Sequence, residues 1–342
     1  LNGQAAVTVA STYDGGTAAL TFTGTSAQTF TLTGAEAKFD GNITVNKASE
    51  TVTLGSALTM DATGQTLTMT SGGLNTSGSN YALTVQSTVT SNGGTLTLNG
   101  STVDFNGNLA IAGGTVVATT ATMTIAGDLS RSSGTFTHNS GTVTLDGASQ
   151  QISNAFTFNH LTKTVTAAAT LTLPVSTTTT IVGTLTLQGA SGQLLSLRSS
   201  TTDTQTSIDP QGTRTVSYLD VKDNNNIHAT TIGCRTGCAS SGNNTNWSIG
   251  APSVTVTESV GTTTVTEGGA TDSYTVVLGV VPTGNVTITI TNAADTTTNA
   301  GTLTFTTSNW NTAQTVTVTA VNDVLDETSP QNSVITQVST SG

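Results

Sequence analysis

Two cysteines, Cys234 and Cys238, stand four positions apart in the segment Gly233-Cys234-Arg235-Thr236-Gly237-Cys238. This spacing allows a small loop closed by a disulfide bond, as is typical of proteins in oxidising compartments. A pair of free thiols is the alternative. A structural zinc ion needs four ligands, and only His228 lies nearby in the sequence. We expect the disulfide, because the rest of the chain has the character of an extracellular protein.

A second group of reactive side chains is acidic. Asp323, Asp326 and Glu327 lie within five positions near the end of the sequence. Hard cations such as Ca²⁺ prefer clustered carboxylate and carbonyl oxygens. The segment therefore indicates a calcium site, although it matches neither an EF-hand nor a nonapeptide calcium repeat. The alternative is a solvated acidic loop that keeps a sparsely charged surface soluble.

Groups that would carry out catalysis are scattered. Several carboxylates of the first 250 residues stand directly beside glycine, as turn residues do, including Asp40, Asp128 and Asp146. The three histidines are isolated in the sequence, and no Gly-x-Ser-x-Gly motif is present. We therefore expect a protein that is not an enzyme. A polysaccharide lyase or hydrolase is the rival reading, supported only by analogy with other β-helices.

Composition narrows the possible partners. The formal net charge is -11 and only 8% of residues are charged. Nucleic acid and anionic lipid are not expected as partners, since both need clustered Lys and Arg. No stretch reaches the roughly 18 apolar residues of a membrane helix, so we expect no membrane span. The first residue is Leu1, which suggests a processed protein or a fragment of a longer one.

The residues between these groups alternate with period two, which predicts β-strands and an all-β fold. The chain is rich in Thr and Val, which argues against disorder because disordered chains are poor in β-branched residues. Phe105-Asn106-Gly107-Asn108-Leu109 is followed twenty residues later by Ile125-Ala126-Gly127-Asp128-Leu129. A unit of this length suits one coil of a parallel β-helix or solenoid, which we predict for residues 1–250. A string of small β-sandwiches is the alternative.

Composition changes near residue 250. Residues 251–342 contain seven acidic side chains and no Lys, Arg or His. Ala251-Pro252 has the character of a linker. About seven strand-like runs follow, which predicts a separate β-sandwich domain over 251–342.

This second segment resembles a Calx-β domain. The matching runs are Val265-Thr266-Glu267-Gly268-Gly269, Asn285-Val286-Thr287-Ile288, Leu303-Thr304-Phe305-Thr306, Asn309-Trp310-Asn311-Thr312-Ala313-Gln314-Thr315-Val316-Thr317-Val318 and Asn322-Asp323-Val324-Leu325-Asp326-Glu327. The resemblance covers about a quarter of the chain. It implies an Ig-like sandwich that binds Ca²⁺ at one tip in some members, and it adds Glu267 to the candidate ligands.

Residues 1–250 resemble the repeats of bacterial surface adhesins and of filamentous-haemagglutinin-type solenoids, mainly in composition. The run from Ile208 to Trp247 is similar to the closing segment of large bacterial β-repeat proteins. Such a segment would cover the apolar end of a solenoid with Tyr218 and Trp247, while Asn side chains bond the loose backbone. The alternative is that both aromatics are ordinary core residues of the last coil.

These features favour an extracellular or cell-surface structural protein, either a stalk or a subunit of a filament, sheath or layer. An adhesin that binds a glycan or a host surface is the alternative. Exposed strand edges would allow self-association by β-augmentation. The segment Ala5-Ala6-Val7-Thr8-Val9-Ala10 is a candidate edge, because no strand precedes it.

Overall fold

The computed structural model describes residues 5–10, 19–34, 38–250, 253–280, 282, 284–323 and 332–341. Within these ranges the secondary structure is all β, and no helix is present that is long and apolar enough to cross a bilayer. The contacts divide the chain into unit 1 (Leu1–Trp247) and unit 2 (Ser248–Gly342). The predicted domain boundary, between residues 250 and 251, lies three residues beyond this division.

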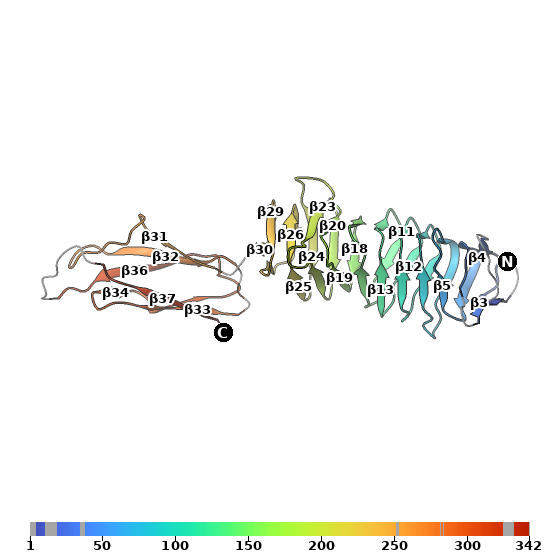
Figure 1. The fold of residues 1–342 in the computed structure, drawn as a ribbon, viewed down its shortest axis with the longest axis horizontal. Helices are drawn as coiled ribbons and strands as arrows, with labels where there is room; N and C mark the ends of the chain where they lie inside the picture. The colour runs from blue at the N-terminus through green and yellow to red at the C-terminus, as the bar shows by residue number, and fades with distance from the viewer. Residues whose placement is uncertain are drawn as a thin grey trace. The chain divides into compact units, whose positions relative to one another are not determined.

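Unit 1 is a solenoid of stacked coils whose strands pair in parallel with the strands of the next coil (Figure 1). Val103 pairs with Met123, Leu109 with Leu129 and Thr115 with Thr135, so three strands of one coil meet three of the next at a step of twenty residues. The predicted solenoid and its repeat are therefore confirmed. The alternative of several small sandwiches is wrong for this region, because its paired strands are parallel.

Three sheets run along the solenoid. The largest contains β1 (Ala6–Ala10), β2 (Leu20–Phe22), β3 (Gln28–Thr33), β4 (Ile43–Leu54), β6 (Leu67–Asn75), β8 (Val89–Ser91), β9 (Thr95–Thr97), β11 (Leu109–Ile111), β12 (Thr115–Val117), β14 (Leu129–Arg131), β15 (Thr135–Thr137), β17 (Gln150–Ser153), β20 (Ala169–Leu173), β23 (Leu195–Ser199), β26 (Leu219–Lys222) and β29 (Ala239–Gly242). The second contains β5 (Leu58–Met60), β7 (Leu83–Val85), β10 (Val103–Phe105), β13 (Thr122–Ile125), β16 (Thr142–Leu145), β19 (His160–Thr164), β22 (Leu185–Gln188) and β25 (Arg214–Ser217). The third contains β18 (Phe156–Phe158), β21 (Thr178–Ile181), β24 (Thr206–Pro210) and β27 (Asn224–Asn226). The strands β28 (Ile232–Cys234) and β30 (Trp247–Ile249) follow at the end.

Alternation along each strand separates the core from the surface. In β16, Val143 and Leu145 are buried while Thr142 and Thr144 are partly exposed. Because successive side chains point to opposite faces, each coil adds its apolar residues to one continuous interior. The outward positions of the second sheet form a column along its strands: Thr59, Thr84, Asp104, Thr124, Thr144, Thr162, Thr186 and Thr215. This column carries one charged side chain.

Glycine is required at one repeated corner of the coils. Gly94, Gly114 and Gly134 follow one another at twenty-residue steps, with φ between 66° and 67°. This left-handed backbone is costly for residues with a Cβ atom. At Gly114, moreover, a Cβ would collide with the backbone of Gly93 and Gly94 in the preceding coil. The corner therefore lets successive coils approach at strand spacing.

Unit 2 consists of two antiparallel sheets. One has the order β31 (Val254–Glu258), β32 (Asp272–Leu278), β36 (Gln314–Ala320) and β34 (Thr296–Thr298). The other has the order β35 (Thr302–Phe305), β33 (Val286–Thr291) and β37 (Thr336–Ser341). Buried residues of both sheets form one cluster, in which Val276 and Val316 come from the first and Ile288 and Phe305 from the second. This arrangement is consistent with a β-sandwich.

Candidate functional site

The cysteine loop lies against the last coils of the solenoid. Cys234 ends β28 and is buried, and its Sγ atom lies 1.97 Å from that of Cys238. The backbone N–H of Tyr218 donates to the carbonyl of Thr236 inside the loop at 2.7 Å. A Cβ at Gly237 would collide with the Tyr218 ring. The loop is thus fixed to Tyr218 by a hydrogen bond and by close packing.

Asparagine side chains hold the chain together at this end of unit 1. Asn224 and Asn226 are buried in β27. The Asn226 amide donates to the carbonyls of Thr230 (2.9 Å) and Asn246 (3.1 Å). The Asn244 amide donates to the carbonyl of Val221 at 2.8 Å. These bonds join side-chain amides to backbone carbonyls within the last coils of unit 1.

The two aromatic side chains expected here are both partly exposed. Trp247 donates its indole N–H to the Asn224 side-chain oxygen at 2.8 Å. Tyr218 has a positive φ of 52° and packs beside the cysteine loop. Each side chain therefore lies at the border between the last coils and solvent.

Charged groups gather on the same coils. Arg198 pairs with Asp220, and Lys222 lies 3.2 Å from Asp203 and 3.8 Å from the buried carboxylate of Asp223. The hydrogen bond from the Asn243 amide, at 2.7 Å, is the largest cause that holds the pKa of Asp223 below its ordinary value. The backbone N–H of Asp203 and the charge of Lys222 act in the same direction. A carboxylate stabilised in its ionised form is a poor proton donor, which suits a structural role.

One histidine–carboxylate contact occurs among the described residues. His228 Nδ1 lies 3.1 Å from Asp209 Oδ1, and both side chains are partly buried. The Asp209 carboxylate also accepts a hydrogen bond from the Gln211 amide at 2.8 Å. Such a pair can in principle act as a base. The other hydrogen bonds at this pair join Asp209 to the Gln211 amide and the backbone N–H of His228 to the Asn226 side-chain oxygen.

Two fully buried lysines escaped the sequence interpretation. Lys163 donates to the carbonyl of Gly147 at 2.8 Å and to the side-chain oxygen of Gln150 at 2.7 Å. Lys47 makes the same kind of contact with Gln28 at 2.9 Å and with the carbonyl of Ser26 at 2.7 Å. Burial lowers the pKa of Lys163 to about 8. The signal was present in the sequence, since Lys47 follows Ile43 and Val45 at the inward positions of its strand.

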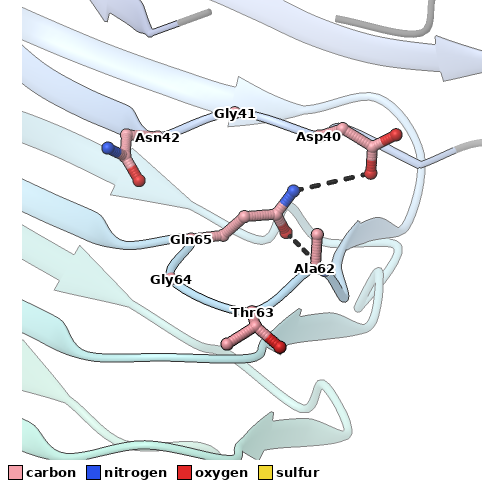
Figure 2. A pocket seen from close by; sticks show the side chains of 7 residues that line it. All are labelled: Asp40, Gly41, Asn42, Ala62, Thr63, Gly64 and Gln65. Atoms are coloured by element: carbon pink, nitrogen blue, oxygen red, sulfur yellow. Dashed lines mark hydrogen bonds between the residues drawn. The ribbon is translucent and has the colours of Figure 1, made fainter. Parts of the chain in front are cut away.

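A shallow polar pocket lies between two successive coils near the start of unit 1. Asp40, Gly41 and Asn42 line one side, and residues 62–65 line the other (Figure 2). Gln65 fills the corner: its amide donates to the carbonyl of Phe39 at 3.0 Å, and its oxygen accepts from the N–H of Ala62 at 3.0 Å. The polar groups thus bond one another, and we assign the pocket a structural role.

Two of the predicted calcium ligands, Glu267 and Asp323, lie in described segments of unit 2. Glu267 is exposed and precedes Gly268, whose position lies beside Asn322. Asp323 follows Asn322 and is also exposed. Asp326 and Glu327 lie outside the described residues. In the described ranges no three His, Cys, Asp or Glu side chains form a metal-binding group. The described residues therefore supply two carboxylates of the predicted set.

Comparison with known proteins finds no match to a protein family, to a curated protein or to a solved structure.

Proposed function

We propose that the chain is a non-catalytic structural protein of the cell exterior, serving as a stalk or as a subunit of a surface filament, sheath or layer. The observation that carries the proposal is the in-register stack of coils, with Val103, Met123 and Val143 in one interior column and threonine outside. Such a stack resists bending because each coil bonds to both neighbours along several strands.

The first strand offers a route to polymerisation. In the described residues β1 pairs with β3 alone. The Thr29 N–H donates to the Ala5 carbonyl at 3.0 Å, so residues 5, 7 and 9 bond to β3. By the alternation of a parallel ladder, the N–H groups of Ala6, Thr8 and Ala10 point to the open side. We propose that this edge pairs with an exposed strand edge of another copy.

Electron microscopy of the purified chain tests this function. We expect filaments or sheets from the natural sequence and from Thr8→Ser. Thr8→Pro should abolish them, because proline removes the N–H that the open edge donates. Dispersed monomers of the natural sequence under all native conditions would overturn the proposal.

An adhesin is the second candidate. Its support is the column of outward threonine hydroxyls, which repeats at the strand spacing of about 4.8 Å and could bond the repeating hydroxyls of a glycan. A glycan-binding screen separates the two: specific binding by chains that do not polymerise would favour the adhesin.

We also retain the calcium site of unit 2 as a proposal. It rests on the proximity of the loops that contain Glu267 and Asp323 and on the preference of Ca²⁺ for carboxylate oxygens.

A further inference from the structure

Among the described residues of unit 2, β31 is an edge strand that no second strand covers on its outer side. In the described residues it pairs only with β32, and all five of its residues are exposed. Val254 and Val256 are 41% and 44% exposed. Natural edge strands are commonly protected by Lys, Pro or a bulge. β31 carries none of these, and its single charge is the terminal Glu258.

The two valines point towards the core side of their sheet. Val254 pairs with Leu278, and Val256 pairs with Val276. Residues directly opposite in an antiparallel pair share a face. Leu278 and Val276 belong to the buried cluster between the two sheets. The apolar face of the sheet therefore continues onto β31, beyond the part that the second sheet covers.

The backbone of β31 has a defined set of open groups. The N–H of Gly279 donates to the carbonyl of Ser253 at 2.8 Å, and the N–H of Ser259 donates to the carbonyl of Ser273 at 3.1 Å. Bonded positions alternate in an antiparallel ladder. Thr255 and Thr257 thus also face β32, while the N–H and C=O groups of Val254, Val256 and Glu258 face the open edge.

We propose that β31 pairs with β31 of a second copy of the chain, antiparallel and across a two-fold axis at Val256. In this register Val256 faces Val256 of the second copy, and Val254 faces Glu258. Open N–H groups then meet open C=O groups, and four valines form one apolar strip.

Charge disfavours one of the other registers that pair open groups with open groups. A register centred on Glu258 would place two carboxylates directly opposite, which is unfavourable. A register centred on Val254 would leave Val256 without a partner strand. A register centred on Thr255 would place Thr255 opposite Thr255 of the second copy, so a cross-link in Thr255→Cys alone would distinguish it from the register proposed. Unit 2 contains acidic residues and no basic ones, so the two copies repel each other at long range. We therefore expect salt to strengthen the dimer, because it screens this repulsion.

This proposal rests on the proposed structural function, because the dimer would be a lateral contact within the filament, sheath or layer. The dimer and the polymer are measured separately. Disulfide trapping in the full chain tests the register. Thr255 would face Thr257 of the second copy as a non-hydrogen-bonded pair, with Cα atoms about 4.5 Å apart, which is within disulfide range. We expect a mixture of Thr255→Cys and Thr257→Cys chains to give a covalent dimer on mild oxidation. Either variant alone should not.

Sedimentation velocity gives the second readout. The natural chain should dimerise at concentrations on the order of 100 μM, since the contact is small. Val256→Lys should weaken the dimer about tenfold or more, because it opposes two ammonium groups at the axis. Val338→Lys is the matched control: Val338 is an exposed valine on the edge strand β37, and its replacement should change nothing.

Two results would overturn the dimer. One is a monomer at every concentration and salt level. The other is a dimer in the wrong register, which would show as a dimer that Val256→Lys leaves intact. It would also show as a dimer that the mixture of Thr255→Cys and Thr257→Cys fails to cross-link. Filaments without the mixed cross-link would leave the structural function standing and remove this contact. A mixed cross-link without filaments would leave the contact between β31 strands standing and remove the structural function.

Discussion

The ammonium group of Lys163 donates a hydrogen bond to the side-chain oxygen of Gln150 at 2.7 Å, with both side chains buried inside the solenoid. The amide of Gln150 in turn donates to the carbonyls of Ile125 (2.8 Å) and Gly127 (2.6 Å) in the preceding coil. The pair thus links three coils. A buried charge is tolerated only where such bonds replace its hydration.

Removing one member of this pair should cost more than removing both. Gln150→Leu leaves the Lys163 charge without one of its acceptors, so we expect a loss of roughly 2–4 kcal/mol in the free energy of unfolding. Adding Lys163→Met to this variant should restore part of the loss. Urea unfolding of the four chains in a double-mutant cycle measures the coupling. Strictly additive effects would contradict the proposed link.

The same lysine predicts a dependence of stability on pH. Its pKa is lowered from 10.5 to about 8 in the folded chain. Between these values the unfolded chain binds more protons than the folded chain, so stability must rise as pH rises. The gain is at most about 3 kcal/mol by linkage and should be absent in Lys163→Met. Equal slopes for the two chains between pH 8 and 10 would refute the assignment.

The glycine corners give a prediction with an internal control. Gly114→Ala should destabilise the solenoid by roughly 2–4 kcal/mol, because it adds a left-handed alanine and a backbone collision. Gly64 also has a positive φ, but nothing lies within 4 Å of its added Cβ. Gly64→Ala should therefore cost only about 1 kcal/mol. Thermal unfolding followed by circular dichroism compares the two, and similar losses would argue against tight stacking at this corner.

The cysteine loop predicts a modest response to reductant. A bond between Cys234 and Cys238 closes a very short loop, so its chain-entropy contribution is about 2 kcal/mol. Reduction should lower the unfolding midpoint of the natural chain and leave that of Cys238→Ala unchanged. Thiol titration of the unreduced, denatured protein should find no free thiol. Two free thiols would restore the alternative reading of these residues.

Calcium should stabilise unit 2 if the two loops form a site. A ligand that binds the folded state raises its stability, so the melting temperature of this unit should increase with added CaCl₂ and fall with chelator. Glu267→Gln should weaken the response. Identical melting curves with calcium and with chelator would remove the proposal.

The sequence predicted the solenoid because its strand signals are local. Strict alternation and a fixed step of twenty residues, as between Leu109 and Leu129, define both the strands and their register. Elsewhere the step changes, and Leu185 pairs with Arg214 at a step of 29. The extra residues form longer corners, so the length of the repeat is not constant along the sequence.

Other features depended on contacts between distant residues. The partnership of Lys47 with Gln28 could not be read from spacing, because the two belong to different coils. The nearness of Glu267 to the loop of Asp323 likewise depends on how the strands of unit 2 return to one tip. The sequence identified Asp323 by its spacing from Asp326 and Glu327, and Glu267 through the resemblance. The Calx-β and Ig-like assignments stay predictions.

The twenty-residue register of β10, β13 and their neighbours has a consequence for how such a protein can evolve. Duplicating one complete coil, for example residues 101–120, would lengthen unit 1 by one strand spacing of about 4.8 Å and leave every existing pair in place. The length of unit 1 can therefore change in uniform increments through in-frame duplication within the gene. Related chains produced in this way would differ in the length of unit 1 by whole multiples of one coil.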